Sequence, residues 1–288
     1  MKKIIVAGSL NADLGITAPH LPAGGETLTG GGFYTGCGGK GANQATAAGR
    51  FGADVVMCGC VGADAFGGML TENLAAAGAD ISLVRRADGV PTGVAVILLT
   101  GGENRIILDR GANALLSEED VERALLLCGE GDIWLTQLEN PLPVVGYGLR
   151  RAKERGLLTI LNPAPADAAV LPFLRYVDLL TPNEGERALL GGTKAFFSAG
   201  VGAVVTTLGG SGYEIACGAD AVQYPCIDVP VLDTTGAGDT FCGALAAELA
   251  RGASLADASR LASKAASIAC TRKGAAASIP TREETLAY

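Results

Sequence analysis

One stretch of this 288-residue chain combines a glycine turn with an acidic residue at the start of a helix. Gly236 and Gly238 can turn tightly and offer bare N–H groups to a ligand. Phe241 and Leu245 follow four residues apart, which predicts a helix that starts near Asp239. Because a helix N-terminus joins unpaired N–H donors to the positive end of the helix dipole, the stretch predicts an anion site. Asp239 is either a base beside a bound phosphate or only the cap of its own helix.

A second glycine motif, at residues 36–41, adds a cation and an amide. Its glycines match a dinucleotide fingerprint by letter, but it follows an irregular segment rather than the first strand, and Gly41 stands where a P-loop needs Ser or Thr. Lys40 and Asn43 are three apart, so they face one way at a helix start. This set can hydrogen-bond the hydroxyls of a small polar ligand. The alternative is that Lys40 is a solvated surface residue.

Polar or glycine clusters also follow several predicted strands. Taken singly, each cluster fits the chemistry of a turn or a helix cap. The carboxyl ends of parallel strands share one edge of a sheet, and ligands bind there, so we expect these clusters to converge. They are residues 11–13, 137–139, 181–186 and 207–212, together with the stretch around Asp239.

The elements that must position these clusters alternate between strand and helix, which predicts an α/β fold with a mostly parallel sheet. Continuous apolar runs predict strands covered on both faces, at residues 3–8, 55–58, 132–136, 157–162, 178–182 and 203–208. Helical spacing and cap signals predict helices up to Arg50 and at about 66–77, 117–128, 141–155, 240–251 and 254–270. Residues 213–232 are predicted to form a β-meander.

Two segments interrupt this alternation. Residues 14–35 are rich in Gly, Pro and Thr and are predicted to form loop and short strands. Residues 92–100 and 103–109 are predicted to pair as a hairpin through Gly101 and Gly102. Together these segments could form a small separate sheet.

Composition excludes several classes of function. A net charge of −8 and a pI near 4.8 argue against a nucleic-acid partner. Apolar runs are too short for a membrane span, which predicts a soluble, cytoplasmic protein. The eight cysteines are expected to be free thiols in a reducing compartment. With one histidine, His20, in a Pro-flanked loop, a general base must be a carboxylate or a lysine.

Seven motifs, in this order and placing, make the chain resemble the ribokinase-like carbohydrate kinase family along nearly its whole length. They are residues 8–13 (GSLNAD), 38–45 (GGKGANQA), 137–139 (QLE), 162–166 (NPAPA), 181–184 (TPNE), 233–239 (DTTGAGD) and 271–275 (TRKGA).

The resemblance implies an ATP-dependent kinase that phosphorylates the primary 5-hydroxyl of D-ribose to give ribose 5-phosphate. Asp239 would be the base, with the N–H groups of Gly236, Ala237, Gly238 and Asp239 as anion hole. The residues implied to bind the sugar are Asn11, Asp13, Gly39, Lys40, Asn43, Glu139 and Asp239. Those implied to bind the nucleotide are Asn183, Glu186, Thr207, Leu208, Gly209, Gly210, Ser211, Gly212, Gly238 and Ser263, with Glu186 also ordering Mg²⁺.

The family also uses a monovalent cation, usually K⁺. The matching positions are Asp233, Thr235, Ala269, Arg272, Gly274 and Ser278. The resemblance further implies one domain over residues 1–288: a three-layer α/β/α fold with a small β-sheet lid at about 13–35 and 92–110, through which two copies form a homodimer. Two alternatives stay open: a kinase for deoxyribose, another sugar or a nucleoside, and a non-catalytic sugar-binding regulator.

Overall fold

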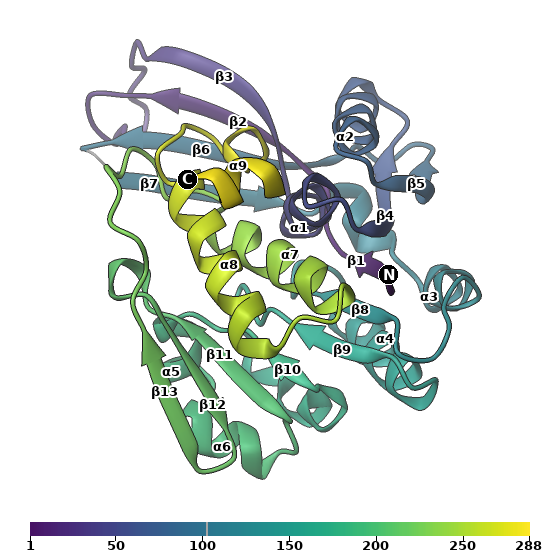
Figure 1. Ribbon diagram of the computed structural model, residues 1–288. Coiled ribbons are helices and arrows are strands. Elements are labelled where there is room, and N and C mark those ends of the chain that lie inside the picture. Colours follow the sequence, from purple (N-terminus) through teal and green to yellow (C-terminus); the bar gives the residue numbers. More distant parts are fainter. Residues whose placement is uncertain (102) are drawn as a thin grey trace.

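The computed structural model describes residues 1–101 and 103–288, and Figure 1 shows the path of the chain. Within those residues the larger of two sheets has nine strands in the order β13-β12-β11-β10-β9-β8-β1-β4-β5. The strands from β11 to β5 pair in parallel, and β12 and β13 add an antiparallel hairpin at one edge. The bounds are β1 (Lys3–Ala7), β4 (Asp54–Gly62), β5 (Asp80–Ala87), β8 (Ile133–Thr136), β9 (Leu158–Leu161), β10 (Leu179–Leu180), β11 (Ala203–Thr207), β12 (Tyr213–Cys217) and β13 (Asp220–Tyr224).

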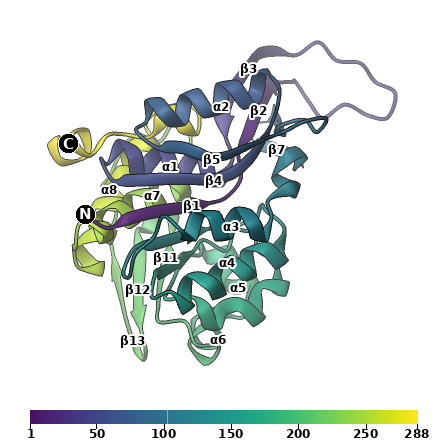
Figure 2. The same cartoon turned by 90° about the vertical axis from the view of Figure 1, so that its right-hand side faces the viewer.

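Helices cover both faces of this sheet, which confirms the predicted α/β/α layers (Figure 2). The core on one face includes residues of α1, α2, α7 and α8, and the core on the other includes residues of α3, α4 and α6. The α-helices are α1 (Lys40–Arg50), α2 (Ala65–Ala76), α3 (Glu118–Leu125), α4 (Leu142–Glu154), α5 (Glu184–Leu189), α6 (Gly192–Ser198), α7 (Ala237–Ala250), α8 (Leu255–Ala269) and α9 (Arg282–Ala287). Short 3₁₀ helices are η1 (Gly111–Leu115), η2 (Ala168–Tyr176), η3 (Gly209–Ser211) and η4 (Ala276–Ser278).

The first strand, β1, contributes to both cores. Ile4 and Val6 lie in the core under α1 and α7, whereas Ile5 and Ala7 lie in the core under α3 and α4. Successive side chains of a strand point to opposite faces, so a continuous apolar run is what a strand with two covered faces requires.

The helices α1 and α7 cross closely because both are built from small residues. A Cβ at Gly243 would lie 2.3 Å from the backbone oxygen of Gln44 and 2.6 Å from Cβ of Ala47. At the start of α1, a Cβ at Gly41 would lie 2.6 Å from Cα of Gly8. These glycines therefore let the first turn of α1 approach both β1 and α7.

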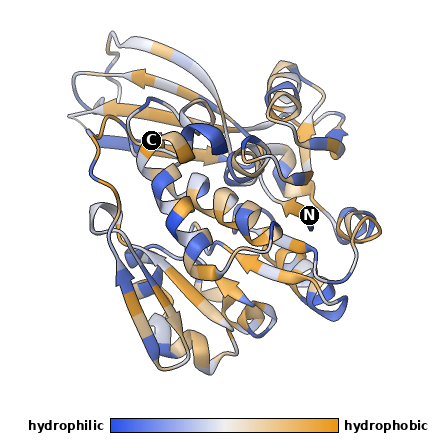
Figure 3. Cartoon of the chain, in the orientation of Figure 1, coloured by the Kyte–Doolittle hydropathy of each residue, from blue (hydrophilic) through white to orange (hydrophobic). Residues whose placement is uncertain are grey.

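The second sheet has four described strands in the order β3-β2-β6-β7: β2 (Asn11–Thr17), β3 (Gly31–Gly38), β6 (Gly93–Thr100) and β7 (Glu103–Asp109). β6 and β7 form the predicted antiparallel hairpin, with Thr100 opposite Glu103; of the two predicted turn residues, Gly102 lies outside the described residues. Figure 3 shows hydrophobic residues along strands of both sheets. In the second sheet several of them are exposed, among them Phe33 and Ile107 at 65% and 75%.

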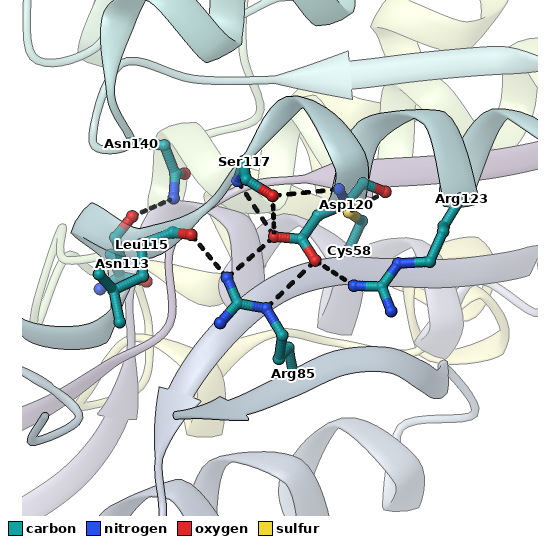
Figure 4. A network of polar contacts seen from close by, with 8 residues as sticks. All are labelled: Cys58, Arg85, Asn113, Leu115, Ser117, Asp120, Arg123 and Asn140. Atoms are coloured by element: carbon teal, nitrogen blue, oxygen red, sulfur yellow. Dashed lines mark hydrogen bonds and ion pairs between the residues drawn. The ribbon is translucent and has the colours of Figure 1, made fainter. Parts of the chain in front are cut away.

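A polar network fastens β5 to α3 and η1 (Figure 4). The buried carboxylate of Asp120 accepts hydrogen bonds from Arg85 at 3.2 and 3.0 Å, from Arg123, and from Ser117 at the N-cap of α3. Arg85 also donates to the backbone oxygen of Leu115, 2.6 Å away. Within the described residues no helix has the length and apolar character that crossing a membrane requires.

Several boundaries differ from the predictions. β5 was not predicted, because the polar residues Asp80, Ser82, Arg85 and Arg86 break up the apolar run of this edge strand. The predicted meander of residues 213–232 forms strands only up to Tyr224. Within the described part of the chain, the eight cysteines are free thiols, as expected.

Candidate active site

The polar clusters that follow the strands meet at one edge of the large sheet. Ser9, after β1, donates through Oγ to Glu139, after β8. Asn183, after β10, forms a parallel bridge with Thr207 at the end of β11. The predicted convergence is therefore present, because parallel strands place all their carboxyl ends on one side.

Asp239 lies in the first turn of α7, with its carboxylate turned toward α1. The helix starts after Gly236, whose φ of 75° is left-handed, and Asp239 is its third residue. Asn43 donates to Oδ2 of Asp239 at 2.9 Å, and Gln44 donates to Oδ1 at 3.0 Å. The alternative that Asp239 caps its own helix is wrong, since its two oxygens accept from side chains of α1.

Gln44 belongs to a buried chain of amides. Its Oε1 accepts from Gln137 at 2.7 Å, and its Nε2 donates both to Asp239 and to Oδ1 of Asn162, 3.1 Å away. Asn162 in turn donates to the backbone oxygen of Thr181 at 2.8 Å. The position of Asp239 is thus tied to β8, β9 and β10.

The residues predicted to bind a sugar lie together on one side of Asp239. Oε2 of Glu139 accepts from Nδ2 of Asn11 at 3.3 Å and from the backbone N–H of Lys40 at 3.2 Å. Gly39, with φ of 89°, is the N-cap of α1, and a Cβ there would lie 2.6 Å from the backbone nitrogen of Asn11. In the described part of the chain, Oδ1 of Asn43 is buried without a hydrogen-bond partner, which suits a ligand hydroxyl.

Asp13 completes this group. Its carboxylate lies against Gly38, where a Cβ would be 2.4 Å from either carboxylate oxygen. Burial, followed by the negative charges of Glu139 and Asp239, raises the pKa of Asp13 to about 7. The turn interpretation of Asn11 and Asp13 is wrong, because both lie in β2.

Lys40 is half-buried rather than solvated. Burial disfavours its ammonium group, but attraction by Asp239, Glu139 and Glu186 outweighs burial and raises the pKa of Lys40. Lys40 and Asp239 both line a cavity of about 900 Å³ that extends from them toward α5 and α8. A cation therefore stands at the junction between the sugar residues and this cavity.

Most residues predicted to bind a nucleotide line the cavity: Asn183, Glu186, Thr207, Gly209, Gly210, Gly212, Gly238 and Ser263. Leu208 and Ser211 lie in the turn at η3, where the N–H of Ser211 donates to the backbone oxygen of Leu208 at 3.0 Å. Gly236, Ala237 and Asp239 line the cavity as well. Of the four N–H groups predicted to form an anion hole, that of Ala237 already donates to the backbone oxygen of Thr234, 3.2 Å away. Those of Gly236, Gly238 and Asp239 have no such backbone partner in the described residues and could face an anion.

Glu186 could support a divalent metal bound with the nucleotide. It forms a capping box with Asn183, in which each side chain accepts the other's N–H at 2.8 Å. Burial raises the pKa of Glu186, although the bond from Asn183 and the charge of Lys40 act against it. A carboxylate at the wall of a cavity that could hold phosphates suits Mg²⁺, which keeps several of its waters.

The predicted cation residues fall on two segments that pack together behind α7. Asp233 accepts from the N–H and Oγ1 of Thr235 at 2.9 and 2.7 Å, and from the N–H of Gly274 at 2.9 Å. Gly236 supports the packing, because a Cβ there would lie 3.1 Å from Cα of Ala275. Ala269 and Arg272 share a backbone hydrogen bond of 3.0 Å in the second segment, and Ser278 follows in η4. A carboxylate, hydroxyls and backbone oxygens together make the kind of oxygen donor set that a hard cation accepts.

Sequence reasoning missed several residues of the site. Gln44 and Asn162 were noticed only as members of motifs, although a glutamine within a run of small residues is a signal for a buried hydrogen-bond network. The wall formed by Cys226, Ile227, Asp228, Val229 and Val231 was expected to continue a meander and carried no motif.

The chain is similar to known proteins over nearly its whole length. The model of the pfkB family carbohydrate kinases matches residues 1–282. The ribokinase of Haemophilus influenzae is 38% identical over 300 residues, covering 100% of this chain and 98% of that protein. The ribokinase structure from Thermotoga maritima superposes with a TM-score of 0.90 at 35% identity, covering 100% of this chain and 99% of that one. Arabidopsis thaliana ribokinase, solved with ribose and ATP, gives a TM-score of 0.88 at 32% identity, covering 99% and 98% of the two chains. The chain therefore belongs to the pfkB family of carbohydrate kinases.

Proposed function

We propose that this protein transfers the γ-phosphoryl group of ATP to the primary 5-hydroxyl of D-ribose, giving ribose 5-phosphate and ADP. The observation that carries this proposal is the place of Asp239, held by Asn43 and Gln44 between the sugar residues and the cavity. The relative from Arabidopsis thaliana, solved with ribose and ATP, supports the choice of substrates.

Asp239 acts as the base. As the hydroxyl oxygen attacks the γ-phosphorus, its proton passes to the Asp239 carboxylate, and the bond from phosphorus to the ADP oxygen breaks. Phosphoryl transfer has a loose transition state, so positioning and charge neutralisation supply most of the catalysis. Asn43 and Gln44 each donate to one of its oxygens and so keep the carboxylate oriented.

The transferred group would lie at the N-terminus of α7. Gly238 and Asp239 offer N–H groups there, and Lys40 supplies a positive charge near the same end of the cavity. Donors already fixed before the reaction stabilise the developing charge without reorganising. Gly236 and Ala237 complete the turn that orients these N–H groups toward the transferred phosphoryl group.

The sugar hydroxyls are proposed to bind Asn11, Asp13, Gly39, Lys40, Asn43 and Glu139, and the nucleotide to bind the cavity residues named above. Carboxylates accept hydrogen bonds from hydroxyls, while the Asn11 amide donates them. These residues can therefore hydrogen-bond several hydroxyls of one sugar, both as acceptors and as donors.

Two metal ions are part of the proposal. Glu186 and Asn183 would order Mg²⁺ and its waters, whose role is to neutralise the phosphate charge. Asp233, with oxygens of Thr235, Ala269, Arg272, Gly274 and Ser278, would hold K⁺ behind the anion site. The observation that supports the K⁺ site is that the Asp233 carboxylate accepts hydrogen bonds from Thr235 and from Gly274.

We further propose that residues 1–288 work as one kinase domain, with the four-stranded sheet as a lid that pairs with a second copy. Exposed apolar side chains on that sheet, such as Phe33 and Ile107, support a paired surface.

The test is ADP release by the purified protein with ribose, 2-deoxyribose, fructose and nucleosides, in potassium and in sodium. Ribose should give the highest kcat/KM, and potassium should exceed sodium. A nucleoside with a higher kcat/KM than ribose would replace ribose as the proposed substrate. Binding of ribose with no ADP release would favour the alternative of a non-catalytic sugar-binding regulator.

A further inference from the structure

Asn113, in η1, has a buried side chain that bonds to the connection between β1 and β2. Its Oδ1 accepts the N–H of Leu10 at 2.9 Å. Its Nδ2 donates to the backbone oxygen of Leu10 at 3.0 Å and to Oδ1 of Asn11 at 2.8 Å. Both amide hydrogens and the amide oxygen are used, so the orientation of this side chain is fixed by its partners.

This contact decides which end of the Asn11 amide faces the sugar residues. Because Oδ1 of Asn11 is occupied by Asn113, Nδ2 of Asn11 is the atom that reaches Oε2 of Glu139. The reverse orientation would set two acceptors against each other at Glu139 and two donors against each other at Asn113. Asn11 is buried, so neither conflict could be relieved by water.

The same side chain lies where the connections between the two sheets meet. A Cβ at Gly93, the first residue of β6, would be 2.3 Å from Nδ2 of Asn113 and 2.4 Å from Oδ1 of Asn11. Gly111, after β7, is equally enclosed, with a Cβ position 2.9 Å from the backbone nitrogen of Gly93. Asn113 therefore contacts the connection after β1, abuts the start of β6 and belongs to the connection after β7.

Separate contacts hold η1 in place behind Asn113 (Figure 4). Nδ2 of Asn140 donates to the backbone oxygen of Asn113 at 3.2 Å, and Arg85 donates to Leu115. These contacts fix the backbone of η1 without touching Asn11, which makes the two roles separable by mutation.

We propose that Asn113 is a positioning residue for sugar binding: it sets the amide of Asn11 so that a hydrogen-bond donor faces the sugar. Neither the sequence motifs nor the family resemblance assigns a role to Asn113. The inference rests on the proposed function, since it requires that Asn11 contacts the sugar.

The test measures the dissociation constants of ribose and of a non-hydrolysable ATP analogue by calorimetry for Asn113→Ala and Asn113→Asp. Asn113→Asp keeps an oxygen that can accept the N–H of Leu10. This variant therefore provides the measurement if the alanine variant does not fold. Losing a buried hydrogen-bond partner costs about 1–3 kcal/mol. That is roughly a 5- to 150-fold change in a binding constant. Ribose affinity should therefore fall by roughly 10- to 100-fold, while nucleotide affinity stays within about twofold.

Two further variants separate positioning from simple support of the fold. Arg85→Met removes the Leu115 anchor of η1 and should lower the melting temperature while leaving ribose affinity unchanged. In an Asn11→Ala background, Asn113→Asp should weaken ribose binding no further, because its effect passes through Asn11.

The proposal is overturned if Asn113 variants lose thermal stability with unchanged ribose affinity, if ribose and nucleotide weaken alike, or if the effects of Asn11→Ala and Asn113→Asp simply add. A wild-type protein that phosphorylates another sugar faster than ribose would instead correct the proposed function. The titrations would then use that sugar, and the same outcomes would decide the role of Asn113.

Discussion

The amide nitrogen of Gln44 lies 3.0 Å from Oδ1 of Asp239, at the crossing of α1 and α7. Gln44 is fully buried and its other amide atom is engaged by Gln137, so it cannot turn away from the carboxylate without breaking a second hydrogen bond. The orientation of the proposed base is therefore set by residues nearly 200 positions earlier in the chain.

Replacing Asp239 with Asn should remove the proton acceptor while keeping the shape of the site. General-base catalysis contributes about 10²–10⁴-fold, so kcat should fall by that factor with ribose affinity kept within about tenfold. Single-turnover kinetics and ribose titration check this. An Asp239→Asn variant that keeps more than about a few per cent of the wild-type rate contradicts the assignment.

Gln44→Glu should move the acidic limb of the pH–rate profile. The variant sets a second carboxylate beside Asp239, and two like charges at hydrogen-bond distance resist ionising together. We expect the limb of kcat to move by about one pH unit or more to higher pH.

Gln44→Met is the matched control, because it removes the amide without adding charge. It should lower kcat while moving the limb less than Gln44→Glu does. Equal profiles for both variants would mean that Gln44 acts only by packing.

Ribose affinity should depend on pH through Asp13. Burial, with the charges of Glu139 and Asp239, raises the pKa of this carboxyl to about 7 in the free protein. If the ionised form of Asp13 accepts hydrogen bonds from sugar hydroxyls, the ribose dissociation constant should rise by up to about tenfold for each pH unit below 7. Calorimetry between about pH 5.5 and 8.5 measures this, and a flat profile refutes it.

The Asp13 carboxyl should also make the free energy of unfolding decrease as the pH rises. Its folded-state pKa, about 7, lies above the ordinary value of 3.8, so the folded protein holds a proton that the unfolded chain has lost. Stability from this group is present at low pH and falls as the pH rises from about 4 to about 7. Asp13→Asn should therefore unfold at higher urea than wild type at pH 8, although it no longer binds ribose normally.

Arg85→Met should destabilise the fold without changing catalysis. Asp120 is buried and Arg85 is one of its partners, so its loss leaves a buried carboxylate with fewer donors (Figure 4). A cost of about 1–3 kcal/mol is expected in urea unfolding, with kcat/KM unchanged. Lys3→Met is the control, because its ion pair with Asp54 is exposed and worth under about 1 kcal/mol.

The proposed homodimer depends on the exposed face of the four-stranded sheet. Ile107, exposed at 75%, should lie in the paired surface. Ile107→Glu should shift the mass measured by light scattering from two chains to one, because a charge cannot be buried there unpaired. Leu189→Glu, at an equally exposed apolar position in α5, should leave the mass unchanged.

Much of the fold could be predicted because parallel strands covered on both faces are continuous apolar runs. β1 and β11 are examples, and the polar residues after them marked the edge where the site lies. Strand β5 was not predicted, because Arg85 and Arg86 interrupt the apolar run of this strand at the edge of the sheet.

The orientation of Asp239 could not be predicted, because it depends on long-range packing. Local sequence made Asp239 a plausible helix cap, whereas the crossing of α1 and α7, allowed by Gly243, turned its carboxylate toward Asn43 and Gln44. Nothing near Asn113 in the sequence points to Asn11, which it meets only in the folded protein.

The division of β1 between two cores has a consequence for synthesis on the ribosome. This strand is translated before both of its neighbours, since it pairs with β4 through residues 54–58 and with β8 through residues 133–136. Ile5 and Ala7 must wait for α3, β8 and α4 to emerge before their side of the strand is covered. A nascent chain stalled before residue 133 thus exposes a hydrophobic strand with an unpaired edge, the kind of surface that chaperones bind.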